Sequence, residues 1–547
     1  MIEGYVNDLK REFQGYNSQK LMKDLLAGLT VAAVALPLAL AFGVSSGADA
    51  GAGLITAIIA GLFIGVLSGA SYQISGPTGA MSAILIGLSQ TYGLQGVFIA
   101  SFLSGCMLFI ASLFKFGKIV SFIPTSVITG FTSGIAVIIA LGQIDNFFGT
   151  VSKGSSALEK LCSYAYLGFH PDLYTVFFGI LVIVIMIVWP RRWGQYFPSS
   201  LAGIVIALIV QLIFNLDVAL VGAIPSTLLP DVRLNIMEVN WFEIKQFILP
   251  AFSIAALGMI ESLLCGASAG KMKNEKLNAD RELFAQGVGN MLIPLFGGVP
   301  ATAAIARTSV AIKSGGQTRL VSVFHAIVLM ISMFVLGPVM SQIPLSALAG
   351  VLMVTAWRMN DWKEIKTIFH NHVKTNMSQY IITMLATIVF DLTVAIIIGV
   401  MVSIILFVLN NSHLNITVTS VDPHRIDKSL KHHHQHTKII YLSGPIFFGT
   451  QEQIMQTYET LDNSTEAIVF SMRGVPSIDD SGIHELLDIV EKCQKDKRFV
   501  IFSGLQENVL CQMERHHFIE IVGNDNICWD TITALELLDD CYLKEDQ

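Results

Sequence analysis

Apolar runs long enough to cross a lipid bilayer recur along most of this chain. A helix of about 20 residues spans a hydrocarbon core of roughly 30 Å. Only 14% of the 547 residues are charged, against about 25% in an ordinary soluble domain. The sequence therefore predicts a polytopic α-helical membrane protein, and it argues against a nucleic-acid binder or a single soluble enzyme. The clear apolar runs are residues 25–43, 51–69, 94–114, 119–142, 173–189, 199–216, 247–269, 318–338, 343–357, 376–391 and 393–410.

Charge divides the chain into two parts. Residues 437–547 carry 8 basic and 20 acidic residues, whereas residues 1–436 carry 26 and 21. The acidic part alternates short strand-like and helix-like stretches, which is typical of a small α/β domain. We therefore expect four regions: a cytoplasmic N-terminal segment (1–24), a membrane domain (25–412), a polar linker (413–436) and a cytoplasmic α/β domain (437–547).

Basic residues indicate the orientation in the membrane. If the N-terminus is cytoplasmic and the spans alternate, every basic cluster falls on the cytoplasmic side. No cleavage site follows the first apolar run, so we expect no removable signal peptide. The pattern predicts a multi-pass protein of the plasma (inner) membrane with both termini in the cytoplasm. Beyond the N-terminus, the basic clusters are Lys115/Lys118, Arg191/Arg192, Lys271–Arg281, Lys313/Arg319 and Arg358–Lys374.

Two short, interrupted apolar segments, Gln73–Leu88 and Pro300–Ile312, resemble each other. Each has a few β-prone residues, then a proline, then a run of small residues. Proline suits the first turn of a helix, so each segment is predicted to be a half-helix that starts inside the membrane. Paired broken segments of this kind indicate inverted repeats with a binding site between them. The alternative is two kinked helices with structural prolines.

A site of this kind suits a compact anion. The N-terminus of a helix presents unpaired N–H groups and about half a positive charge, so two facing N-termini bind an anion without any charged side chain. Small residues let the ligand approach the backbone, and two threonines add hydroxyl donors. The predicted binding residues are Pro77, Thr78, Gly79, Ala80, Ala301, Thr302, Ala303 and Ala304.

Two charged residues lie in or beside the apolar segments of the second half. Glu261 is in the middle of an apolar run. A carboxyl at that depth costs several kcal/mol if it is ionised and unpaired, so Glu261 is a candidate to carry a coupling ion, or else a structural hydrogen-bonding residue. Arg307 lies near the end of the second half-helix. It is a candidate for gating or for attracting anions, or else an anchor at the cytoplasmic surface.

The C-terminal part offers one candidate for regulation. The stretch Asp479-Asp480-Ser481-Gly482 lies where a loop meets a predicted helix, and either Ser481 or Asp480 would cap that helix. A phosphate on Ser481 would lie on a helix N-terminus, which favours anions. Ser481 is thus a candidate regulatory phosphosite, with a plain N-cap as the alternative. We expect no cofactor, no metal site and no enzyme activity, because no nucleophile–base or ligand set lies at a suitable spacing.

Several motifs together resemble the SulP (sulfate permease) family of anion transporters. In the membrane part they are Val34-Ala-Leu-Pro37-Leu-Ala-Leu-Ala-Phe-Gly43, Ile74-Ser-Gly-Pro-Thr78, Glu282-Leu-Phe-Ala-Gln286-Gly-Val-Gly-Asn290 and Gly297-Gly-Val-Pro-Ala-Thr302. The tail, with Leu442-Ser-Gly-Pro-Ile-Phe-Phe-Gly449 and Asp480-Ser-Gly482, resembles a STAS domain. The resemblance implies fourteen membrane segments in two inverted repeats of seven, a core domain that slides against a gate domain, a homodimer, and a cytoplasmic partner at the STAS domain.

The resemblance also suggests how transport is driven. The first segment is most similar to the bicarbonate-transporting branch, which has a sodium site. The matching positions here are Glu261, Cys265, Ala303, Ala304 and Ile305, and of the sodium ligands only a carboxylate remains. We therefore expect proton-coupled symport of sulfate, bicarbonate or a C4-dicarboxylate. The alternatives are a sodium-coupled bicarbonate symporter, a passive anion channel or exchanger, and a membrane-anchored STAS signalling protein without transport.

Overall fold

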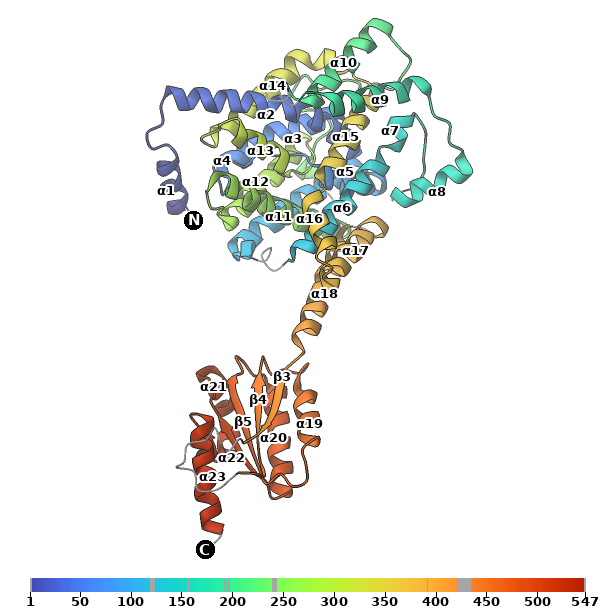
Figure 1. Ribbon diagram of the computed structural model, residues 1–547. Coiled ribbons are helices and arrows are strands. Elements are labelled where there is room, and N and C mark those ends of the chain that lie inside the picture. Colours follow the sequence, from blue (N-terminus) through green and yellow to red (C-terminus); the bar gives the residue numbers. More distant parts are fainter. Residues whose placement is uncertain are drawn as a thin grey trace. The chain divides into compact units, whose positions relative to one another are not determined.

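The computed structural model describes residues 2–118, 123–154, 157–190, 193, 197–238, 244–390, 392–421 and 434–545. The chain divides into two compact units, Met1–Ser403 and Ile404–Gln547. The first unit is almost entirely helical and the second contains a five-stranded sheet (Figure 1).

The first unit is built from helices joined mostly by short turns. A π-helical turn, Ala60–Ile64, continues α3, and Gly93, with φ 67°, divides α5 into two helical parts. Each part of α5 thereby takes its own direction. The helices are α1 (Ile2–Glu12), α2 (Ser18–Ser45), α3 (Ala50–Ile59), α4 (Gly65–Leu67), α5 (Gly79–Leu113), α6 (Thr125–Gly142), α7 (Ile144–Phe148), α8 (Ala157–Leu167), α9 (Leu173–Val188), α10 (Ser199–Phe214), α11 (Lys245–Lys273), α12 (Ala279–Leu292), α13 (Ile305–Lys313), α14 (Leu320–Met340), α15 (Leu345–Met359), α16 (Trp362–His370), α17 (Lys374–Val389) and α18 (Leu392–Asn411).

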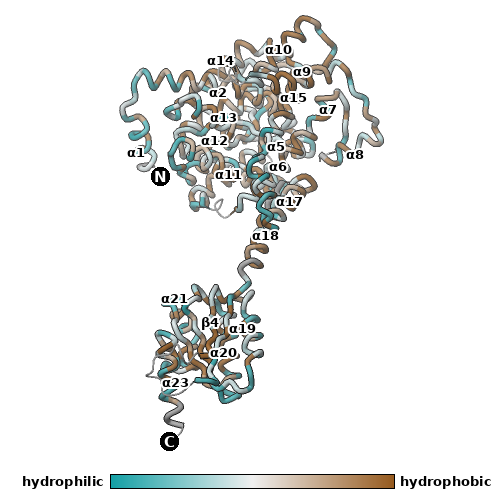
Figure 2. The backbone as a smooth tube through the Cα atoms, viewed as in Figure 1, coloured by the Kyte–Doolittle hydropathy of each residue, from teal (hydrophilic) through white to brown (hydrophobic). Residues whose placement is uncertain are grey.

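The outside of this unit is apolar. Six helical stretches among the described residues have the length and composition to cross a membrane, including α2, α11 and α14. Large apolar side chains such as Ile187 on α9 and Ile213 on α10 are exposed, and hydrophobic residues dominate the helices (Figure 2). Such a surface is costly in water and favourable in lipid. The prediction of a polytopic membrane protein is confirmed, whereas the count of fourteen segments and the repeat symmetry remain predictions.

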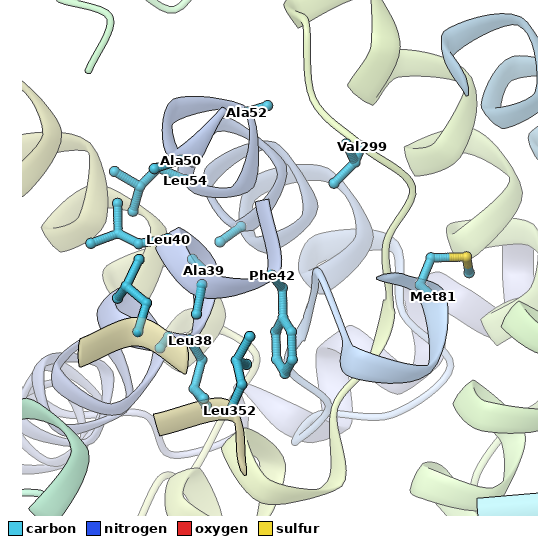
Figure 3. Packing of buried hydrophobic residues seen from close by; sticks show 14 of the residues in the cluster. Leu38, Ala39, Leu40, Phe42, Ala50, Ala52, Leu54, Met81, Val299 and Leu352 are labelled. Atoms are coloured by element: carbon cyan, nitrogen blue, oxygen red, sulfur yellow. The ribbon is translucent and has the colours of Figure 1, made fainter. Parts of the chain in front are cut away.

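Close packing of α2 against α3 forms the centre of the unit's core. A Cβ atom on Gly53 would lie 1.9 Å from the carbonyl oxygen of Ala39, so only glycine allows this backbone contact. Leu40 of α2, Leu54 of α3 and Leu352 of α15 belong to the buried cluster in this region (Figure 3). This core holds the start of the chain firmly against the second half.

The second unit is a small α/β fold. Its sheet has the order β3-β4-β5-β6-β7, with β3 antiparallel to β4 and the other neighbours parallel. The strands alternate their side chains between two faces, so the two sheet faces pack in two separate buried clusters. The strands are β3 (Asn415–Ser420), β4 (Thr437–Ser443), β5 (Ala467–Gly474), β6 (Phe499–Ser503) and β7 (Ile527–Cys528), and the helices are α19 (Gln451–Glu459), α20 (Asp480–Lys495), α21 (Glu507–Arg515), α22 (Phe518–Val522) and α23 (Thr531–Glu545).

Two details of this unit differ from the sequence analysis. The predicted linker 413–436 contains β3, which extends the sheet as an edge strand; residues 422–433 lie outside the described ranges. Asp479, rather than Ser481 or Asp480, caps α20, because its carboxylate accepts the N–H of Gly482 at 2.9 Å. Ser481 lies half-buried in the first turn of that helix.

Candidate functional site

Two short strands from distant parts of the chain meet inside the membrane unit. β1 (Ser75–Gly76) pairs antiparallel with β2 (Thr302–Ala303), with Ser75 opposite Ala303 and Gly76 opposite Thr302. β1 leads into α5 at Gly79, and β2 leads into α13 at Ile305. The two interrupted segments of the sequence thus lie side by side, and each starts a helix after an extended stretch, as predicted. Neither proline lies in the first turn of its helix, however, because Thr78 caps α5 and Ala304 caps α13.

Three side-chain oxygens cluster where the strands end. The hydroxyl groups of Thr78 and Thr302 both donate to Oε2 of Glu261, at 2.9 and 2.5 Å, and their oxygens lie 3.1 Å apart. Thr302 is fully buried, whereas Glu261 keeps some accessible surface. Two hydroxyl donors stabilise a carboxylate, and a protonated carboxyl can instead donate to one of the threonines. The cluster can therefore hold Glu261 in either protonation state.

Helix α12 supports both strands with a row of polar side chains. Gln286 donates to Ser75 Oγ at 2.9 Å, and Glu282 accepts bonds from Ser68 Oγ at 2.6 Å and from Gly69 N–H at 3.0 Å. Asn290 both accepts the N–H of Ala301 at 2.7 Å and donates to its carbonyl at 2.9 Å. In the sequence, these three residues stand out only as part of a family motif. Their spacing of four residues, which places all three side chains on one face of a helix, is the signal by which they could have been found.

The backbone N–H groups of the second segment are mostly used within the fold. Ala301 donates to Asn290, Ala303 donates to Ser262 Oγ at 3.1 Å, and Ala304 donates to the carbonyl of Ile74 at 2.9 Å. Since α13 begins only at Ile305, its unpaired first-turn donors start there, directly after the predicted residues 301–304. Ala301, Ala303 and Ala304 therefore shape the site and position α13, and their N–H groups are not free to bind a ligand.

The first segment keeps the donors that the sequence predicts. Thr78 is the N-cap of α5, and its hydroxyl oxygen also accepts the N–H of Met81 at 3.4 Å. Gly79 and Ala80 are the first residues of the helix, where the helix itself pairs no N–H group. A Cβ on Gly79 would lie 2.5 Å from Ile139 Cδ1, so α6 closely approaches this helix end. A larger residue at position 79 would force the side chain of Ile139 to shift.

Arg307 is fully buried, at 1% exposure. Its Nη2 donates to the carbonyl of Pro77 at 3.1 Å, and its Nη1 has no hydrogen-bond partner among the described residues. A Cβ on Gly76 would lie 2.1 Å from Nη1. Arg307 is thus not an anchor at the cytoplasmic surface. It places a positive charge directly behind the bend that leads into α5, which favours an anion there.

The comparisons with known proteins agree with this architecture. Residues 21–385 match the sulfate permease family, and residues 428–533 match the STAS domain. The chain is 33% identical over 501 residues to the "Putative sulfate transporter YvdB" of Bacillus subtilis, covering 90% of this chain and 93% of that protein. It is 28% identical over 529 residues to the bicarbonate transporter BicA of Synechocystis, covering 94% and 93%.

A solved structure shows the same fold at lower sequence identity. The murine solute carrier 26 family member A9 anion transporter, in its inward-facing state, matches with a TM-score of 0.84 and 17% identity, covering 96% of this chain and 92% of that one. The matching family consists of transporters, which confirms the expectation that the chain is not an enzyme. The chain belongs to the sulfate permease family and carries a C-terminal STAS domain.

Proposed function

We propose that this protein is a secondary active transporter of compact anions, driven by protons through Glu261. The observation that carries the proposal is the bonding of Glu261 Oε2 to both Thr78 and Thr302. A group that can take up or release a proton thereby contacts the N-cap of one half-helix and the strand that leads into the other. A proton carried with the anion offsets part of its charge and lowers the cost of crossing an apolar barrier.

Two groups of helices support an elevator-type movement. The first group includes α5, α11 and α13, which hydrogen bonds connect at the site: Gln73 donates to the carbonyl of Ser262, and the N–H of Ile74 donates to Thr308 Oγ1. The second group includes α6 and α17, which bond to each other, with Tyr380 Oη 3.2 Å from Ser133 Oγ. The described contact of Gly79 with α6, by contrast, is apolar. We infer that the first group moves as one body along the second.

The substrate is proposed from chemistry and from relatives. Two half-helix N-termini, two hydroxyls and the buried Arg307 suit a small oxyanion. Similar proteins are named as transporters of sulfate and of bicarbonate. We therefore propose sulfate or bicarbonate as substrate, with a C4-dicarboxylate as the third candidate.

A competition panel identifies the substrate and separates the alternatives. The purified protein is placed in proteoliposomes, and uptake of labelled sulfate, bicarbonate, succinate and fumarate is measured with and without sodium. If transport is coupled to protons, uptake should increase with an inward proton gradient and should not depend on sodium. A sodium requirement indicates the sodium-coupled symporter, gradient-independent flux indicates a channel or exchanger, and no flux indicates a signalling protein.

Orientation and assembly remain proposals. Arg281 and Arg319 bind Asp8 and Glu12 of α1 at 2.6 and 2.8 Å, so basic residues from distant helix ends lie beside the N-terminal segment. By the positive-inside rule this end faces the cytoplasm. We propose a homodimer in the plasma (inner) membrane, with both termini and the STAS domain in the cytoplasm. A cytoplasmic protein partner of that domain and phosphorylation of Ser481 are proposed with it.

Deleting residues 437–547 is expected to change activity, assembly or surface level without changing which anion is preferred. The reason is that the described site lies wholly in the membrane unit, between α5, α11 and α13. The measurement is the order of inhibition by the panel anions in full-length and truncated protein at matched surface levels. An altered order after the deletion would show that the tail contributes to the site.

A further inference from the structure

A cavity of about 400 Å³ lies in the membrane unit outside the cluster of Glu261, Thr78 and Thr302. Its walls come from the end of α2, the first part of α5, the end of α6, the start of α11 and the end of α17, together with one residue of α8. Most of the lining is apolar, and the hydroxyl-bearing residues in it are Ser45, Ser82, Thr91, Tyr92 and Ser253. The cavity therefore lies between the two groups of helices that we propose to move against each other.

The cavity lies at the opposite end of the membrane unit from the basic cluster. Ser45, which lines it, is the last residue of α2, whereas Asp24, near the first turn of α2, bonds to Thr318 beside Arg319. These two positions on one helix are roughly 30 Å apart at 1.5 Å per residue. If the basic end faces the cytoplasm, the cavity opens to the outside.

The cavity leads toward the candidate binding site. Ser82 lies one helical turn after Thr78 and donates to the Thr78 carbonyl at 2.9 Å. Ile139, which also lines the cavity, lies against Gly79 at the start of α5, next to the ring of Phe42. An anion in the cavity would therefore be separated from the first-turn donors of α5 by these two apolar side chains.

Lys160 of α8 is the one charged side chain that lines the cavity among the described residues. Burial lowers the pKa of its ammonium group below the ordinary value, and the nearby Asp145 opposes this shift. The Asp145 carboxylate is already bonded to Tyr164 at 2.8 Å, to Thr150 at 3.2 Å and to Ser152. Within the described residues the ammonium of Lys160 has no ion pair or hydrogen bond. It is thus a partly desolvated cation that is bonded to no carboxylate of the described part of the chain.

We propose that Lys160 recruits the transported anion into this cavity, an inference that rests on the proposed transport function. A single positive charge in a cleft with low-dielectric walls concentrates anions and speeds their binding, by about tenfold or more. An ammonium suits this role because it attracts any oxyanion as a point charge, without the fixed bidentate geometry of arginine. Lys160 is a positioning residue for the approach of the anion, and the site near Glu261 remains the place where it is bound for transport.

The test measures the concentration dependence of uptake in cells that carry equal surface amounts of each variant, with labelled sulfate, bicarbonate and succinate as probes. K160Q is expected to raise KM by about tenfold at low ionic strength and to leave the maximal rate unchanged. K160R should restore KM. The matched control is K153Q, which removes an exposed lysine that precedes α8 and does not line the cavity, and it should behave as wild type.

Ionic strength separates recruitment from a structural role. The KM of wild type should rise as salt screens the charge of Lys160, and the KM of K160Q should rise much less. If K160Q reaches the surface poorly, the proposal can still be tested, because it requires the KM of wild type to depend on salt. Equal KM values for K160Q, K153Q and wild type, or a salt-independent wild-type KM, would overturn the proposal while the transport function stands. If wild type takes up none of the probes, the transport function itself fails, and the role of Lys160 fails with it.

Discussion

Replacing Glu261 by glutamine is expected to abolish anion accumulation driven by a pH gradient while anion–anion exchange persists. Glutamine has the shape of the protonated side chain and can still bond to Thr78 and Thr302, which contact the carboxylate at 2.9 and 2.5 Å. It cannot release a proton, so the anion moves without its driving ion. A gradient of one pH unit supplies about 1.4 kcal/mol per proton, which corresponds to a tenfold concentration ratio of the anion. The mutant should show none of this accumulation.

The measurement is labelled anion uptake by proteoliposomes at external pH values from roughly 5.5 to 8, a range within which a buried carboxyl can titrate. Wild-type uptake should increase toward acidic pH, and E261Q uptake should be flat. The control is D231N, which removes an exposed carboxylate from the same unit and should keep the wild-type profile. Full accumulation by E261Q would show that Glu261 is structural and that the proton travels elsewhere.

Replacing Asn290 by leucine is expected to reduce both stability and anion uptake. The change leaves the N–H and C=O groups of Ala301 without their bonds of 2.7 and 2.9 Å to Asn290. Buried and unpaired, these groups cost about 1–3 kcal/mol each. Since Ala301 begins the stretch that positions Thr302 and α13, we also expect transport to fall by about one to two orders of magnitude, as for a catalytic group displaced by roughly 1 Å.

A matched variant separates stability from site geometry. Gln211 is also a buried amide, and it lies on α10, away from β1 and β2. Its Nε2 donates to the carbonyl of Leu216 at 2.9 Å. Q211L should lower the thermal unfolding midpoint but leave anion affinity and transport close to wild type. If Q211L and N290L reduce uptake equally at equal loss of stability, Asn290 has no special role in the site.

Local patterns in the sequence were sufficient to predict the main elements of the site. A proline followed by small residues marked both half-helices, and an isolated carboxyl in an apolar run marked Glu261. The structure brings Thr78, Thr302 and Glu261 within hydrogen-bond distance of one another. The alternation of strands and helices in the STAS domain was also evident, because their apolar periodicities differ, but the edge strand β3 was predicted to be linker.

Features that depend on tertiary distance could not be predicted in this way. The N–H groups of Ala303 and Ala304 are paired by Ser262 and Ile74, which only the folded chain brings near them. Arg307 follows a run of small residues and reads as a residue near a helix end, yet the fold buries it against Pro77. Neither result follows from propensity or spacing, because each depends on which elements pack together.

Proton-driven transport is tested by measuring accumulation of the anion in sodium-free proteoliposomes, with the membrane potential held at zero and the outside one pH unit more acidic than the inside. We predict that the internal concentration rises above the external one, toward about tenfold for one proton per anion, and that a protonophore abolishes the excess. Equilibration to equal concentrations with no excess, or accumulation that appears only when sodium is added, would contradict proton-driven transport by this protein.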